Sequence, residues 1–124
     1  MDFFLIDKDE FSLNGTNVKL GKRIVRYEVF YKYDIVVLLV SNTDNYYNTN
    51  EIIAIKDLNH ICQPIWTYQR KDTLGQIYSI YTIWRVMQND DERIACFINS
   101  LGFYDETNVF DIETGEIIDT QLSK

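Results

Sequence analysis

Two consecutive segments favour β-strands and constrain the fold more than any other feature of the chain. In residues 23–33 (RIVRYEVFYKY), apolar and aromatic side chains alternate with Arg26, Glu28 and Lys32, and only Phe30 interrupts the polar face. Alternation with a period of two is typical of a strand that is buried on one face. Residues 35–40 (IVVLLV) are continuously apolar, which favours a central strand buried on both faces. We therefore predict an all-β fold.

Further strands are predicted at short β-branched or aromatic runs between polar turns. These runs cover residues 3–6, 52–55, 64–68, 77–87, 93–98 and 109–112. The clearest turn is 113–116 (ETGE), where Gly115 can adopt a positive φ between the runs VFDI and EIID. The strands are short and separated by turns, so we expect antiparallel sheets.

Residues 51–62 (EIIAIKDLNHIC) leave two interpretations open. Ile52, Ile55, Leu58 and Cys62 recur near helical spacing, and Asn50 could cap a short helix. The β-branched context favours two strands joined by a turn.

Shifting the chain against itself by 57 positions suggests an internal repeat. The shift places Tyr27 on Trp84, Val37 on Ile94, and the run of strands after residue 23 on the run after residue 80. In the two halves, TNEIIAIKDLNHI and TNVFDIETGEII resemble the outer hairpins of β-propeller blades. Two blades cannot close a ring, so the resemblance implies a sandwich, a half-barrel or a two-blade propeller-like arrangement.

The length of 124 residues and the 46% hydrophobic content suit one globular domain over residues 1–124. The first residues lack the features of a secretory signal, and no apolar run approaches the roughly 20 residues that a membrane helix needs. We expect a cytoplasmic protein that does not bind a membrane. Cys62 and Cys96 lie in apolar strings, so we expect buried free thiols.

No standard catalytic or metal-binding arrangement is present in the sequence. His60 is the single histidine, and with Cys62 it forms too small a set of ligands for a metal site. No glycine-rich phosphate loop and no nucleophile motif occurs. We expect a non-enzymatic protein that has no cofactor and no metal.

The negative charge is concentrated at the carboxyl end of the chain. Residues 1–89 contain ten acidic and ten basic residues, whereas residues 90–124 contain nine acidic residues against Arg93 and Lys124. The net charge of −7 therefore resides in the last 35 residues. A field of this sign attracts basic partners and repels phosphate backbones, so we do not expect nucleic-acid binding.

Two polar segments, residues 41–50 and 99–108, carry adjacent aromatic pairs that suit protein contacts. With the two densest acidic clusters, they give the predicted partner-binding residues Tyr46, Tyr47, Asp90, Asp91, Glu92, Phe103, Tyr104, Asp105 and Glu106.

In size, charge and strand content, the chain resembles the immunity proteins that neutralise bacterial toxins, many of whose targets are basic nucleases. This resemblance implies an inhibitor that covers a basic toxin domain with an acidic surface containing aromatic anchors. The alternative interpretation is a small-molecule-binding β domain in which aromatic residues, including Tyr27 and Trp84, line a cavity between sheets.

Overall fold

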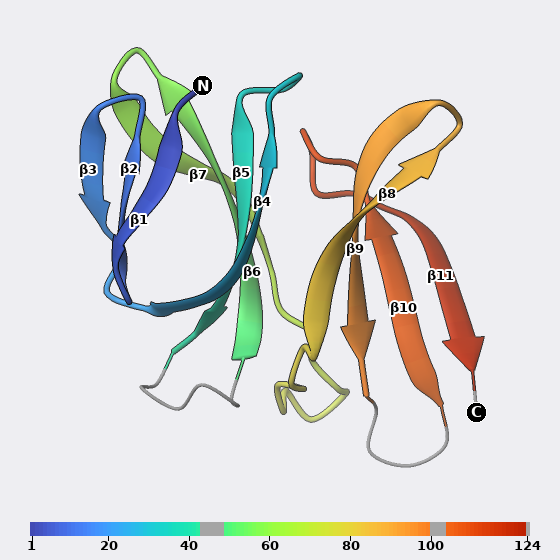
Figure 1. The fold of residues 1–124 in the computed structure, drawn as a ribbon. Helices are drawn as coiled ribbons and strands as arrows, with labels where there is room; N and C mark the ends of the chain where they lie inside the picture. Colours follow the sequence, from blue (N-terminus) through green and yellow to red (C-terminus); the bar gives the residue numbers. More distant parts are fainter. Residues whose placement is uncertain (43–48, 100–103, 124) are drawn as a thin grey trace.

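The computed structural model describes residues 1–42, 49–99 and 104–123, and within these ranges it contains eleven strands and no helix. The strands form three antiparallel sheets, each connected as a meander, which confirms the all-β prediction. Figure 1 shows the sheets as three successive layers with the middle sheet between the other two. None of the sheets closes into a barrel.

The N-terminal sheet contains β1 (Phe3–Asp7), β2 (Glu10–Leu13) and β3 (Thr16–Lys19). The middle sheet contains β4 (Arg23–Phe30), β5 (Ile35–Ser41), β6 (Thr49–Leu58) and β7 (Ile61–Tyr68). The C-terminal sheet contains β8 (Thr82–Gln88), β9 (Asp91–Ile98), β10 (Asp105–Phe110) and β11 (Ile117–Ser123). The sequence patterns did not predict β2 or β3. They also began the strand that corresponds to β8 at residue 77, whereas residues 77–81 lie outside the strand.

Two core layers hold the three sheets together. One layer, with Phe11, Leu38 and Ile53 among its members, lies between the N-terminal and middle sheets. The other, with Val37, Ile94 and Phe110 among its members, lies between the middle and C-terminal sheets. Side chains alternate along each strand, so β5 supplies both layers and all seven of its residues are buried. This confirms the prediction of a central strand buried on both faces.

The polar face predicted for residues 23–33 is only partly covered, because Glu28 and Phe30 meet the C-terminal sheet whereas Arg26 and Lys32 stay exposed. Phe30 is fully buried against the C-terminal sheet. Next to it, the guanidinium of Arg85 lies 4.7 Å from the centre of the Phe30 ring and 3.7 Å from Glu28. The other face carries Tyr27, whose ring packs 4.9 Å from Phe3 of the N-terminal sheet. The strand therefore packs on both sides.

Residues 51–62 form a hairpin and not a helix, as the β-branched context predicted. Leu58 pairs with Ile61, and the two turn residues Asn59 and His60 have φ angles of 56° and 67°. Positive φ at both central positions is the pattern of a type I′ hairpin turn. Asn14-Gly15 and Asn89-Asp90 close two further hairpins in the same way.

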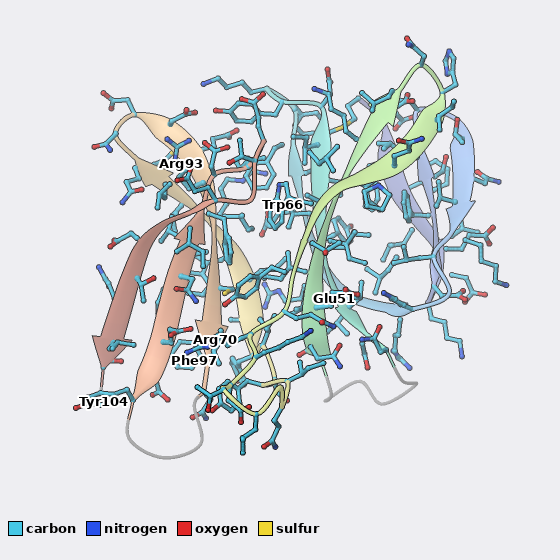
Figure 2. The ribbon with its side chains drawn as sticks, turned by 180° about the vertical axis from the view of Figure 1, so that it is seen from behind. Glu51, Trp66, Arg70, Arg93, Phe97 and Tyr104 are labelled. Atoms are coloured by element: carbon cyan, nitrogen blue, oxygen red, sulfur yellow. The ribbon has the colours of Figure 1, made fainter. Side chains whose placement is uncertain are left out.

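The turn at residues 113–116 lies directly against the middle sheet. Gly115 has a φ of 73°, as the sequence allowed, and a Cβ atom there would lie 2.5 Å from the Trp66 ring. Trp66 stacks on Phe110 with ring centres 5.7 Å apart and donates from its indole Nε1 to the carbonyl of Ile112 at 2.7 Å. In Figure 2, Trp66 lies between the two larger sheets.

The 57-residue repeat holds for strands but not for faces. Adding 57 to the bounds of β5 gives 92–98, against 91–98 for β9, and the pair Arg26–Leu39 corresponds to the pair Ile83–Cys96. The strands β4 and β8 run in the same direction (Figure 1). Equivalent residues of two sheets that are stacked in the same orientation should point in the same direction. Leu39 and Cys96 instead lie in the same core layer between the two sheets, so their side chains point toward each other. The structural equivalence is therefore displaced by one residue from the sequence match, and this reverses the faces.

Both cysteines are free thiols, but only one is fully buried. Cys96 lies in the core layer between the larger sheets, and burial raises its pKa to about 12. Cys62 is half-buried at the edge of the other core layer, and burial also raises its pKa. The prediction of two buried thiols is thus confirmed for Cys96 and only partly for Cys62.

Candidate functional site

The C-terminal sheet has a face that points away from the middle sheet, which we call the outer face. Pairing and alternation assign to it the side chains of Thr82, Trp84, Val86, Arg93, Ala95, Phe97, Asp105, Thr107, Val109, Asp119 and Gln121. None of the elements that the structure describes packs on this face (Figure 1).

The centre of the outer face is apolar. Ala95 has Trp84 as its partner on one side and Val109 on the other, and it is fully buried because these larger neighbours cover it. Trp84, Val109 and Phe97 are themselves half-buried. Tyr81, which is 73% exposed, meets the Phe97 ring edge-on with centres 6.1 Å apart. Half-buried aromatic groups of this kind are the anchors that protein interfaces favour.

Three carboxylates lie at the ends and on one edge of this sheet. Asp90 lies at one end of the sheet, Asp105 at the other, and Asp119 on the edge strand β11. None of the three has an ion-pair or hydrogen-bond partner within residues 1–42, 49–99 and 104–123. Such unpaired charges remain available for a partner.

Both arginines of the C-terminal sheet are already paired. Arg93, whose side chain is 17% exposed, lies 3.1 Å from Asp91 and 3.9 Å from Asp111. Arg85 lies 3.0 Å from Glu92. In the described part of the sheet, the charge left unpaired is therefore negative.

The structure separates the two acidic clusters that the sequence combined into one site. Asp91 and Glu92 begin β9 and Asp90 lies in the turn just before it, whereas Glu106 pairs with Ile98 at the other end of that strand. Seven residue steps along a strand span roughly 23 Å. Figure 2 shows this separation through Arg93 and Tyr104, which lie at opposite ends of the sheet.

Asp91 joins two hairpin turns. Its Oδ1 accepts hydrogen bonds from the Tyr33 hydroxyl and from the Lys32 ammonium, the latter at 2.9 Å. These two bonds, with the Tyr33 bond contributing most, hold the pKa of Asp91 well below its usual range. Asp91 and Glu92 therefore connect parts of the fold, and of the first predicted cluster only Asp90 is free to bind a partner.

Glu106 is also part of an internal network, because its side chain is only 14% exposed. It accepts hydrogen bonds from Arg70 Nε and from Asn108 Nδ2, both at 2.9 Å. Asn108, which is buried, accepts a further bond from the Thr120 hydroxyl at 2.7 Å. Glu106 therefore connects β10 to the segment that follows β7, and the neighbouring Asp105 is the accessible carboxylate.

Of the predicted aromatic anchors, Tyr104 is 46% exposed at the start of the C-terminal sheet's third strand. Tyr46, Tyr47 and Phe103 lie outside the described residues.

The structure does not bring together Tyr27 and Trp84, the two residues named for the alternative of an aromatic-lined cavity. Tyr27 packs between the N-terminal and middle sheets, whereas Trp84 lies on the outer face. A cavity of about 610 Å³ does open near the junction of β4 and β8, and among the described residues that line it Tyr81 is the aromatic one. Its other lining residues are Val25, Arg26, Thr49, Ser79, Ile80, Thr82 and Asn99.

The described residues contain no group of three or more His, Cys, Asp or Glu side chains that could hold a metal ion. His60 lies in a hairpin turn with positive φ, so it does not share a strand face with Cys62. The described segments also contain no helix that is long and apolar enough to cross a membrane.

The sequence reasoning missed the central residues of the outer face, and one signal could have identified them. In residues 82–86 (TIWRV), Ile83 is followed by Trp84 and Val86 follows Arg85, so large apolar side chains fall on both faces of the strand. Such a strand at the end of a stack of sheets must expose one apolar face.

Comparison with models of known protein families, with curated protein sequences and with solved structures finds no match for the chain.

Proposed function

We propose that the protein is a non-enzymatic inhibitor that binds a basic protein, such as a bacterial nuclease toxin, through the outer face of its C-terminal sheet. One observation carries this proposal. An uncovered sheet face has half-buried Trp84, Phe97 and Val109 at its centre and unpaired carboxylates at the ends and on one edge of the sheet, while both arginines of the sheet are paired internally.

The inhibitor would act by occlusion. A nuclease holds its substrate with lysine and arginine side chains that contact phosphate groups. The carboxylates Asp90, Asp105 and Asp119 would occupy those cations, and the apolar centre would provide the desolvated contact that slows dissociation. The net charge of −7 would accelerate encounter with a basic partner at low salt. The free thiols suit the reducing cytoplasm, where we place the protein.

The direct test is inhibition of a panel of purified catalytic domains of basic bacterial nuclease toxins, measured on a fluorescent RNA or DNA substrate. We expect at least one domain to be inhibited at stoichiometric concentration. The variant Asp105→Lys/Asp119→Lys should then weaken binding at least about tenfold, since opposed like charges repel.

The matched control is Glu113→Lys/Glu116→Lys, which changes the net charge equally in an exposed turn away from the outer face. It should weaken binding less than the outer-face variant, and the melting temperatures of all proteins should agree. Equal losses in the two variants would show a long-range field and exclude the outer face as the binding site. A panel without one inhibited domain would refute the inhibitor function.

A further inference from the structure

We infer that the partner docks on the outer face with a face of a β-sheet that carries apolar and basic side chains, and not with a strand added to the free edge of β11. This inference rests on the proposed function and specifies the chemistry and geometry of the partner.

The outer face continues the stacking of sheet faces within the protein. Both core layers of this protein are made by one sheet face packed on another. β4 and β8 run in the same direction, and β7 packs against β10 through Trp66 and Phe110, so the outer face corresponds structurally to the face of the middle sheet that carries Phe30, Val37 and Leu39. That face packs against a sheet, so the outer face offers the next position in the same stack.

Two apolar side chains of the outer face, Trp84 and Val86, lie far from the free edge of β11. The strand order in the sheet is β11-β10-β9-β8, so β8 lies at the edge opposite to β11. Three strand spacings separate the two edges, which is roughly 14 Å. A strand added to β11 would therefore leave Trp84 and Val86 uncovered, whereas a sheet laid across the face would cover both.

Charge is distributed unevenly across the outer face. The β8 and β9 side carries Trp84, Val86 and Phe97, and its Arg93 is paired with Asp91, whereas the β10 and β11 side carries Asp105 and Asp119. A fitting partner has an apolar strip beside a row of lysine or arginine residues. A second copy of this chain does not fit, because each copy brings a net charge of −7 and the same acidic face.

The area of the sheet sets a further requirement. Four strands of about seven residues cover roughly 20 by 23 Å, or about 450 Å² in the plane of the sheet. A stable interface buries about 800 Å² on each partner. The partner must therefore also reach the surrounding turns and side chains, where Tyr81, Asp90 and Tyr104 are exposed.

The two tryptophans allow a direct test by NMR. The indole N–H of Trp84 reports on the outer face, and that of Trp66, which is bonded to the carbonyl of Ile112, is an internal control. The probe is a cyclic amphipathic β-hairpin peptide with valines on one face and lysines at its rim. The control peptide has glutamate in place of every lysine.

We expect the lysine peptide to shift the Trp84 indole signal and the amides of β8 to β10, while the Trp66 indole signal stays in place. Its binding at low salt should be at least about tenfold tighter than that of the glutamate peptide. Methylation of the outward backbone nitrogens of the peptide should not weaken binding, because face docking uses no edge hydrogen bonds. Thr107→Lys, which places a cation at the centre of the face, should weaken binding at least about tenfold.

Three results would overturn the inference. Shifts confined to β11 that disappear on methylation would show edge pairing. Equal binding of the two peptides would show apolar adhesion without charge selection. Absence of any shift would exclude docking of a sheet face. Inhibition of a nuclease in the panel is measured separately, so each of these results leaves the proposed function to be judged by its own experiment.

Discussion

Gly115 packs directly against the Trp66 ring, where a Cβ atom would lie 2.5 Å from the ring, so its side chain has to be a hydrogen atom. We predict that Gly115→Ala destabilises the fold by about 2–5 kcal/mol. Positive φ contributes about 1–2 kcal/mol, and displacement of Trp66 from the overpacked site contributes about 1–3 kcal/mol. Urea denaturation measures the difference.

The control for this prediction is Gly75→Ala. Gly75 has a φ of 81°, but nothing lies within 4 Å of a Cβ atom built there. This variant should lose only the backbone contribution. Equal losses in the two variants would show that Trp66 moves aside without cost.

Asp91 makes the stability of the protein depend on pH. Its pKa is lowered in the folded state by the hydrogen bonds from Tyr33 and Lys32. A carboxylate with a lowered folded pKa stabilises the fold above its unfolded pKa of about 4, and this contribution is lost as the pH falls through the folded pKa. We predict that Asp91→Asn lowers the urea midpoint at pH 7 and that the gap to the unmodified protein narrows at pH 3.

Asp90→Asn is the matched control, because Asp90 is exposed in the adjacent position and makes no ion pair with the described residues. It should leave the midpoint unchanged at both pH values. A gap for Asp91→Asn that stays constant between pH 7 and pH 3 would contradict the assignment of the charge effect to Asp91.

Among the elements, the hairpin of β6 and β7 contains a turn residue that the structure strains. His60 has a φ of 67° at the second position of a type I′ turn, where glycine is the preferred residue. We predict that His60→Gly stabilises the protein by about 0.5–1 kcal/mol. The free energy gained by removing the Cβ atom from a positive-φ position exceeds the free energy lost because glycine raises the conformational entropy of the unfolded chain. Thermal denaturation measures the gain.

His60→Ala provides the comparison, since alanine keeps a Cβ atom at the same backbone angle. It should give no gain in stability. A gain of equal size in both variants would indicate that the imidazole, and not the backbone angle, is unfavourable at this turn.

For the whole molecule, the shared core layers predict unfolding in one step. Trp66 reports on the interface of the two larger sheets, and Trp84 reports on the outer face of the last one. In the variants Trp84→Phe and Trp66→Phe, each with one tryptophan left, the fluorescence midpoint in urea should equal the midpoint from far-ultraviolet circular dichroism. A Trp84 signal that changes before the circular dichroism would show that the C-terminal sheet unfolds on its own.

Local patterns in the sequence determined the strands of the middle and C-terminal sheets. Alternation and β-branched runs identify β4, β5 and β9, and the charge count places the acidic residues near the carboxyl end. The signal for the missed hairpin of β2 and β3 is also local, because Asn14-Gly15 is a strong type I′ turn sequence. These features depend on backbone geometry within a few residues, so the sequence alone can show them.

Tertiary structure decided which face of each strand is covered and which carboxylates remain free. Asp91 and Asp90 are neighbours in the sequence, yet only Asp91 meets Tyr33 and Lys32, which are about 60 residues away along the chain. Trp84 becomes part of an outer face because the stack of sheets ends with β8 to β11. A displacement by one residue reverses the faces of a strand, so composition and spacing cannot determine this outcome before the sheets pack.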